Sequence, residues 1–206
     1  VSEHGTDLMA IKDLFFEGYE DNIIFTQEKF APHQMNFLYN MSDVQILLSS
    51  NEGWGLSLTE AMLAGNPIIA NVTGGMQDQM RFQDGKGLWF TPDENIPSNH
   101  RGTYKTHGPW AFPVFPTIIS IVGSPPTPYI FDDRCRWEDA TDRIKEIYDL
   151  DPEERKARGL KGREWVLGSE AGFTSKHQAN RVMEAFTELF ETWTPREKYE
   201  IVNATK

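Results

Sequence analysis

The sequence predicts an α/β fold with a parallel sheet flanked by helices. Residues 44–48 and 67–72 are short, mostly apolar runs, as is typical of strands buried on both faces. The stretch Leu56–Ala64 between them has the length and composition of a helix, and Gly65 is placed to end it. Strand, helix and strand in alternation favour parallel strands joined by a right-handed crossover.

The flanking elements are predicted in chain order from apolar periodicity and from capping signals. Asp151 and Pro152, followed by two acids, form a strong helix start, because they combine an N-cap, a first-turn proline and charges that complement the helix dipole. A short β-type run spans residues 23–26. Helices are expected at residues 6–16, 32–41 and 137–148, from Asp151 onward, and from Ser175 to about residue 193.

Residues 83–130 interrupt this alternation. They hold most of the prolines of the chain, together with several glycines and many aromatic residues, and they show no clear period. We expect a long irregular insertion with one or two strands around residues 116–122, in a single domain that spans residues 1–206 and closes with helices at about 137–193. Loops of this length in a compact domain are usually functional.

Composition excludes several classes of function. The net charge of -11 argues against broad nucleic-acid binding, which needs a positive surface. Cys135 is the only cysteine, so an internal disulfide framework is excluded and a reducing, cytoplasmic location is expected. The first ten residues lack the features of a signal peptide, and the longest apolar stretch, residues 111–123, is short and contains prolines. We therefore expect no integral membrane segment.

Residues 49–62, which read SSNEGWGLSLTEAM, carry the strongest functional signal. They lie between a predicted strand and a predicted helix, where ligands bind in open α/β sheets. A glycine-flanked turn exposes backbone N–H groups, and the helix start adds partial positive charge, which together suit a phosphate. Glu52 and Glu60 bracket the turn, and carboxylates accept hydrogen bonds from sugar hydroxyls. The pattern predicts a ligand with phosphate and polyol parts.

Glu52 and Glu60, with seven residues between them, resemble the E-x7-E motif of retaining GT-B glycosyltransferases of the group 1 kind. Their surroundings, EGWGLSLTEAMLAGNPIIA, are similar to the family pattern E-G-F-G-L-x-x-x-E-A-M-x-x-G-x-P-V-V-A. NFLYNMSDVQILLSS, DPEERKARGLKGREWV and GGMQD also resemble family segments, with Asp78 where glutamate is usual. The resemblance covers most of residues 22–82 and 137–193, and it implies the Rossmann-like C-terminal half of a GT-B fold.

This resemblance implies transfer of a hexose-type sugar from a nucleoside diphosphate donor, with retention at the anomeric carbon and without a metal or other cofactor. Glu52, the candidate catalytic residue, would bond hydroxyls of the donor sugar, and Glu60 would accept both ribose hydroxyls. Ser57 would touch the diphosphate, and the base would lie near residues 26–29. The sugar and its phosphate would be lined by the backbone N–H groups of four residues, Gly53, Trp54, Gly55 and Leu56.

Several of these residues also have structural interpretations. Ser57 and Glu60 fit a capping box at a helix start. Trp54 fits a core or lid aromatic as well as it fits a ligand contact. His100 and His107 are expected to make local hydrogen bonds rather than to bind a metal. Asp132 and Asp133 are expected to cap the helix before Trp137 rather than to form a metal-binding pair.

The family also carries an N-terminal Rossmann-like domain and a first C-terminal-domain strand that brings basic residues to the diphosphate. Neither is seen in this sequence, so we expect an N-terminal GT-B domain as a partner and leave the acceptor open. An alternative function is a non-catalytic nucleotide-sugar-binding module, or a domain fragment that works only with a partner. A GT-B-like epimerase is a further alternative, but it would need acid and base residues, and none stands out.

Overall fold

A computed structural model of the chain describes residues 6–89, 99–100, 102–124 and 127–196. The chain divides into two compact units, residues 1–35 and 36–206, and helix α2 crosses the boundary between them. The described elements are, in order, α1 (Leu8–Phe15), η1 (Glu20–Asn22), α2 (Pro32–Met41), β1 (Gln45–Leu47), α3 (Leu56–Ala64), β2 (Ile68–Asn71), α4 (Gly74–Asp78), β3 (Ala111–Val114), β4 (Ile118–Ser124), β5 (Thr127–Arg134), α5 (Trp137–Tyr148), α6 (Pro152–Leu167) and α7 (Ser175–Thr192).

The N-terminal unit contains α1 and the short helix η1. Asp7 caps α1, because its Oδ1 accepts hydrogen bonds from the backbone N–H groups of Met9 and Ala10, both at 3.1 Å. The prediction of a strand at residues 23–26 is wrong, since these residues are irregular. The described part of this unit offers them no second strand, and a strand without a partner leaves its backbone groups unpaired.

The second unit is built on a parallel sheet, as predicted, and the strands of this sheet have the order β1-β2-β3. Every residue of the central strand β2 is buried. Strand β1 does not meet the expectation of burial on both faces, because Ile46 is 38% exposed. This strand lies at one edge of the described sheet, and its two faces are covered unequally.

Strand β3 lies inside the segment that was predicted to be irregular. It pairs in parallel with β2, with Ile68 opposite Ala111 and Asn71 opposite Val114. Pro113 obscures this strand in the sequence because proline cannot donate to a ladder, yet β3 is an edge strand of the described sheet, where proline is tolerated. The prediction of an irregular insertion over all of residues 83–130 is therefore wrong for this stretch.

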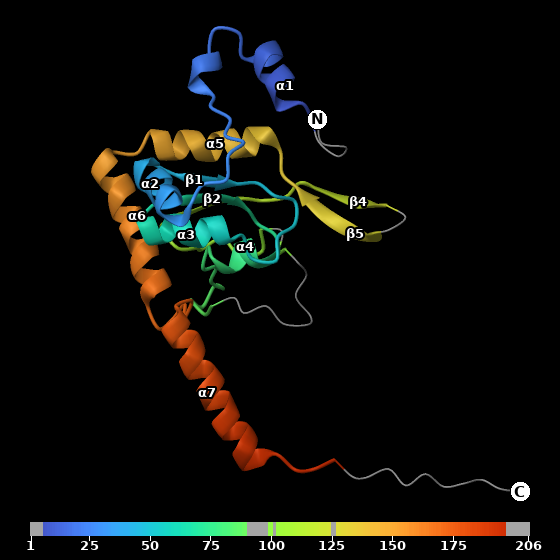
Figure 1. Cartoon of the computed structure of the whole chain (residues 1–206), viewed down its shortest axis with the longest axis vertical. Coiled ribbons are helices and arrows are strands. Elements are labelled where there is room, and N and C mark those ends of the chain that lie inside the picture. Colours follow the sequence, from blue (N-terminus) through green and yellow to red (C-terminus); the bar gives the residue numbers. More distant parts are fainter. Residues whose placement is uncertain (1–5, 90–98, 101, 125–126, 197–206) are drawn as a thin grey trace, which may run out of the picture. The chain divides into compact units, whose positions relative to one another are not determined.

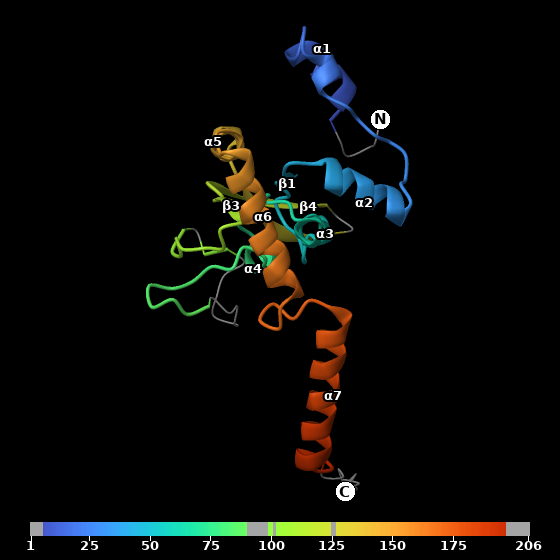
Figure 2. The same cartoon turned by 90° about the vertical axis from the view of Figure 1, so that its left-hand side faces the viewer.

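Helices cover both faces of the sheet (Figure 1 and Figure 2). On one face, Ile68, Ala70 and Val72 share a core cluster with residues of α3, α4 and α6. On the other face, Ile69 shares a second cluster with Ala140 and Ile147 of α5. The alternation of neighbouring β2 side chains between the two clusters follows from the two-residue period of a strand. The sheet with its two helical layers confirms the α/β prediction.

Strands β4 and β5 form an antiparallel hairpin that extends beyond the predicted strand region. Asp132 and Asp133 pair with Ser120 and Ile119 in this hairpin. The prediction that these acids cap a helix is therefore wrong, because strand pairing fixes their backbone. Helix α5 instead has Arg136 at its N-cap, without a side-chain capping bond.

The last two helices begin where the sequence predicts. Asp151 caps α6 by accepting a 2.9 Å hydrogen bond from the backbone N–H of Glu153. Helix α7 is capped by Thr174 and has no buried residue, and Phe190 on its apolar face is 82% exposed. Within the described ranges, no helix is both long and apolar enough to cross a membrane.

Candidate active site

The candidate site lies on the turn that joins β1 to α3, beyond the carboxyl end of β1. Gly55 occupies the N-cap of α3 with a φ of +82°, which favours glycine. A Cβ at Gly55 would also meet the Leu47 side chain at 3.0 Å. The turn and the first two turns of the helix carry all seven residues singled out in the sequence, Glu52, Gly53, Trp54, Gly55, Leu56, Ser57 and Glu60.

The two glycines at the start of α4 pack directly against this turn. The N–H of Gly75 donates to the Glu52 carbonyl oxygen at 3.1 Å. A Cβ on Gly75 would lie 2.2 Å from the Gly53 carbonyl oxygen, and one on Gly74 would lie 2.2 Å from that of Glu52. Only glycines allow the two backbones to approach this closely, so the start of α4 packs against the turn and fixes its backbone.

Glu52 is half-buried, and one of its carboxylate oxygens is already engaged. Oε1 accepts a 2.9 Å hydrogen bond from the Ser49 hydroxyl. The Ser49 carbonyl oxygen in turn accepts from Asn71 Nδ2 at 3.1 Å. The Ser49 residue thus links Glu52 to the end of β2. Oε2 accepts no hydrogen bond from the described residues and can accept one from a ligand.

Glu60 is exposed on α3, and Tyr39 of α2 orients it. The Tyr39 hydroxyl donates to Glu60 Oε2 at 2.7 Å. Burial, and then the hydrogen bond to Glu60, raise the pKa of Tyr39 to about 12, so the phenol stays a donor at neutral pH. The capping-box interpretation is wrong, because Gly55 is the N-cap and makes no side-chain bond, while Ser57 lies inside the helix.

Trp54 makes its contacts within the protein. Its indole Nε1 donates to Thr59 Oγ1 at 2.9 Å, and its ring packs edge-on against Phe173 with centroids 4.8 Å apart. Gln79 Nε2 donates to the Trp54 carbonyl oxygen at 2.6 Å. These contacts favour the structural interpretation of Trp54, because they attach the turn to the rest of the second unit.

The base of the β4–β5 hairpin contacts the same turn, which the sequence analysis missed. The N–H of Asp133 donates to the Ser50 carbonyl oxygen at 3.0 Å, and Ser50 Oγ donates to Asp132 Oδ2 at 3.1 Å. Asp133 is buried and accepts from Thr73 Oγ1 at 2.8 Å. The sequence signal at this position was the acidic pair Asp132 and Asp133, which we interpreted as a helix cap.

Asp78, at the end of α4, is an acid in an unfavourable position. Burial raises the pKa of its carboxyl to about 6. Its Oδ1 is buried and finds no hydrogen-bond donor among the described residues. The carboxyl therefore favours the neutral form more than an exposed aspartate does.

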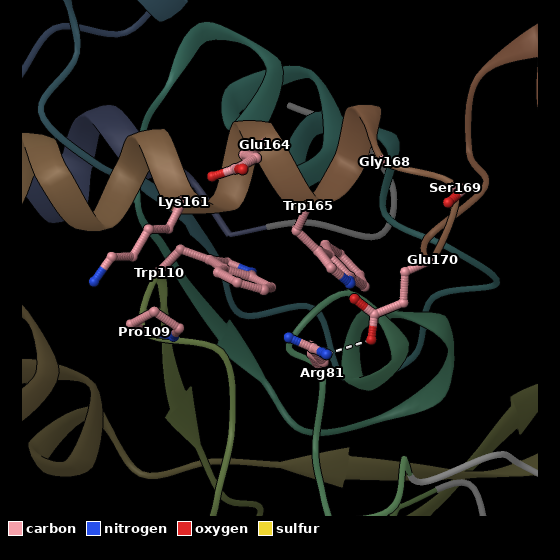
Figure 3. Close-up of a pocket in the computed structure, with 9 residues that line it drawn as sticks. All are labelled: Arg81, Pro109, Trp110, Lys161, Glu164, Trp165, Gly168, Ser169 and Glu170. Carbon is pink, nitrogen blue, oxygen red and sulfur yellow. Dashed lines mark hydrogen bonds and ion pairs between the residues drawn. The ribbon is translucent and has the colours of Figure 1, made fainter.

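A separate cavity of about 410 Å³, the tryptophan cavity, is drawn in Figure 3. Trp110 and Trp165 stack there with ring centroids 5.0 Å apart, and Arg81 forms an ion pair with Glu170 near Trp165. None of the seven turn residues lines it. The full lining is Arg81, Pro109, Trp110, Lys161, Glu164, Trp165, Gly168, Ser169 and Glu170.

The two histidines of interest belong to an aromatic cluster. His100 is buried against Phe82, with ring centroids 4.2 Å apart, and burial lowers its pKa to about 4. His107 lies 6.0 Å from the same phenylalanine ring and bonds the Gly108 carbonyl oxygen. Across the residues that the structure describes, no group of three or more potential metal ligands is found.

Comparison with known proteins matches part of the chain to a family. Residues 12–99, which include the whole candidate turn, match the family described as glycosyl transferases group 1. Trehalose synthase from Pyrococcus horikoshii is 32% identical over 79 residues, which are 38% of this chain and 19% of that enzyme. Trehalose synthase from Thermococcus litoralis is 29% identical over an equal length with the same coverage. The chain thus matches these relatives over about a fifth of their length.

The fold comparison extends over more of the chain. Sucrose-phosphate synthase from Thermosynechococcus elongatus aligns with a TM-score of 0.56 at 20% identity, over 92% of this chain and 36% of that chain. The likeness therefore includes the parallel sheet and its flanking helices. Residues 12–99 therefore match the group 1 glycosyltransferases, and the chain has a fold similar to that of the GT-B glycosyltransferases.

Proposed function

We propose that the Glu52–Glu60 turn binds a nucleoside diphosphate sugar, and that the domain serves transfer of a hexose-type sugar with retention at the anomeric carbon. The observation that carries this proposal is the position of two oriented carboxylates on either side of a helix start. The related enzymes, named for synthesis of trehalose and of sucrose phosphate, favour a hexose-type sugar.

The start of α3 supplies the donors for the diphosphate. The first N–H groups of a helix have no partner within it, and the helix dipole places partial positive charge there. Gly53 is exposed and Ser57 half-exposed at this point, so a phosphate can approach. Such local donors hold an anion even on a protein whose net charge is -11.

Glu60 is proposed to bind the ribose. Its carboxylate is exposed, lies on a rigid helix, and has one oxygen fixed by Tyr39. A carboxylate has about four lone-pair sites, so the Tyr39 bond leaves room for two ribose hydroxyls. Hydrogen bonds to a charged group contribute about 1.5–3 kcal/mol each.

Glu52 is proposed to contact the hydroxyls of the donor sugar, next to the reacting carbon. The protein would contribute positioning and stabilise charge on the departing diphosphate. The turn contains no second acid or base beside Glu52, which suits a mechanism in which the leaving phosphate itself accepts the acceptor proton. We propose that an N-terminal GT-B domain supplies the binding site for the acceptor and some of the residues that contact the diphosphate.

Calorimetry with uridine, guanosine and adenosine diphosphates, and with their glucose conjugates, tests the proposal. One nucleotide of the panel should bind, and Glu60→Ala should weaken its binding about ten- to hundredfold, since a charged acceptor is lost. Glu60→Gln should lose less. Glu184→Ala, which removes an exposed glutamate on α7, is the matched control. An unchanged dissociation constant for folded Glu60→Ala would refute the ribose assignment.

Activity measurements distinguish a glycosyltransferase from the alternative, a non-catalytic binding module. Sugar transfer and donor hydrolysis are measured for the chain alone and after addition of a GT-B N-terminal domain. We expect binding without turnover for the chain alone, because positioning contributes about 7–11 kcal/mol to barrier reduction and needs both domains. Turnover at an ordinary enzymatic rate by the chain alone would contradict the proposed partner.

A further inference from the structure

We propose that the β4–β5 hairpin is the positioning element for Glu52, and that it acts through Asp132 and Asp133. This inference rests on the proposed donor site, because it assigns the hairpin a role in recognising the sugar part of the donor. Among the described residues, the hydrogen bond to the Glu60 side chain comes from Tyr39 and not from the hairpin, so the inference concerns Glu52 alone.

The hairpin and the turn are joined by a ring of hydrogen bonds. Asp133 N–H donates to the Ser50 carbonyl oxygen at 3.0 Å, and Ser50 Oγ donates to Asp132 Oδ2 at 3.1 Å. Asn71 closes the ring, because its Nδ2 donates both to the Asp133 carbonyl oxygen at 2.8 Å and to the Ser49 carbonyl oxygen at 3.1 Å. Ser49 then donates to the Glu52 carboxylate.

Burial makes this ring rigid. Asp133 is 3% exposed and Asn71 is fully buried, and Thr73 Oγ1 donates to the Asp133 carboxylate at 2.8 Å. A buried polar group that loses its partner is destabilised, so these side chains cannot move independently. The conformation of residues 49–52 therefore depends on strand β5. Asp132 of this strand lies 82 positions after Ser50 in the sequence.

Glu52 needs such a support because it lies outside any helix or strand. A carboxylate on a loop keeps a productive orientation only when surrounding bonds fix the loop, and small displacements reduce binding and rate. The hairpin also depends on the turn, since an isolated two-stranded hairpin is only marginally stable. The two segments thus order each other.

The test compares two affinities of the same protein: that for a nucleoside diphosphate and that for its glucose conjugate. Ser50→Ala removes the hydroxyl that bonds Asp132. It should lower the preference for the glucose conjugate about three- to tenfold and leave the nucleotide affinity within about twofold, as loss of one hydrogen bond implies. Ser42→Ala, which removes an exposed serine bonded to the Leu38 carbonyl oxygen, should change neither affinity.

A double-mutant cycle shows whether Ser50 acts through Glu52. Glu52→Gln should lower the same preference, and Ser50→Ala should have no further effect in that background. Thr73→Val, which removes the hydroxyl bonded to Asp133, is the second variant and should lower the preference as Ser50→Ala does. Wild-type preference in both Ser50→Ala and Thr73→Val, or an undiminished effect of Ser50→Ala beside Glu52→Gln, would overturn the inference.

The outcome also separates this inference from the proposed function. Wild-type protein that binds neither ligand, or that shows no preference for the glucose conjugate, would refute the donor site, and the inference would fall with it. A preference that is lost in Glu52→Gln but kept in Ser50→Ala and Thr73→Val would uphold the donor site and refute only the role of the hairpin.

Discussion

Glu52 and Glu60 stand eight positions apart, and their side chains are held in different ways. Glu60 lies on a helix, and its side chain accepts a hydrogen bond from Tyr39. Glu52 lies on a loop whose backbone and neighbours bond to α4, to the end of β2 and to the hairpin. A helix alone directs a carboxylate, whereas a loop needs contacts from several distant segments.

This difference predicts that the two halves of the proposed site respond separately to mutation. Changes in α4 or in the hairpin should affect the sugar side, where Glu52 lies. Changes in α2 should affect the ribose side, where Glu60 lies. The substitutions that follow are in α4 and α2, in order of decreasing expected effect.

Gly75→Ala should have the largest effect. The added methyl group would lie 2.2 Å from the Gly53 carbonyl oxygen and 2.8 Å from Trp54 Cα, so one of the two backbones must move. We expect a loss of about 3 kcal/mol or more in the free energy of unfolding, measured with urea.

The control for this substitution lies on the other side of the same contact. A Cβ on Gly53 would meet nothing within 4 Å, so Gly53→Ala should change the free energy of unfolding by no more than about 0.5 kcal/mol. Equal stability of the two variants would show that α4 does not pack closely against the Glu52 turn.

Asp78→Asn tests α4 through pH. The pKa of Asp78 is raised to about 6, above its ordinary value of 3.8, so its stabilising contribution is complete below pH 3.8 and is lost as the pH rises through 6. Asparagine does not ionise. Relative to wild type, the variant should therefore gain about 1–2 kcal/mol between pH 4 and pH 7.5, a figure reduced for partial solvent screening.

Urea unfolding of both proteins at the two pH values measures this gain. Asp149→Asn, at the exposed C-cap of α5, serves as the control and should show no comparable gain. A stability difference between Asp78→Asn and wild type that is independent of pH would show that the Asp78 carboxyl is not held in its neutral form by burial.

Tyr39→Phe should have the smallest effect, confined to the ribose side. It removes the hydroxyl that bonds Glu60, so the affinity for the nucleoside diphosphate should fall about three- to tenfold, the equivalent of roughly 1 kcal/mol. The preference for the glucose conjugate should not change. A lowered preference would show that the two carboxylates are not held independently.

The titration of Tyr39 gives a second measurement on the same support. Ultraviolet absorbance of phenolate, taken as wild type minus Tyr39→Phe, should show ionisation near pH 12 rather than pH 10, because the neutral phenol is buried and donates to Glu60. Ionisation near pH 10 would mean that this hydrogen bond is weak in solution.

The sequence predicted the elements whose signals are local. The β1–α3–β2 unit follows from two apolar runs and from Gly65, whose φ of +91° ends α3 as expected. Strand β3 was not predicted, because Pro113 is acceptable only at a sheet edge, and edge position depends on the whole sheet. The structure of the hairpin base was likewise hidden, because Asp133 is fixed by contacts with distant residues.

The capping-box alternative for Glu60 was also based on a local signal, and it is wrong. The spacing of Ser57 and Glu60 favours a capping box, but Gly55 takes the N-cap and Tyr39 takes the carboxylate. The residue types of the proposed site were visible in the sequence, whereas the bonds that orient them come from α2, α4 and the hairpin. Such bonds follow from tertiary packing, which one segment of sequence does not determine.

The most direct test of the proposed site is a crystal structure with a bound nucleoside diphosphate glucose, chosen by calorimetry. We expect the diphosphate at the backbone N–H groups that begin α3, the ribose hydroxyls on Glu60, and the glucose hydroxyls on Glu52. Nucleotide bound in the tryptophan cavity, or elsewhere with Glu52 and Glu60 untouched, would contradict the proposal.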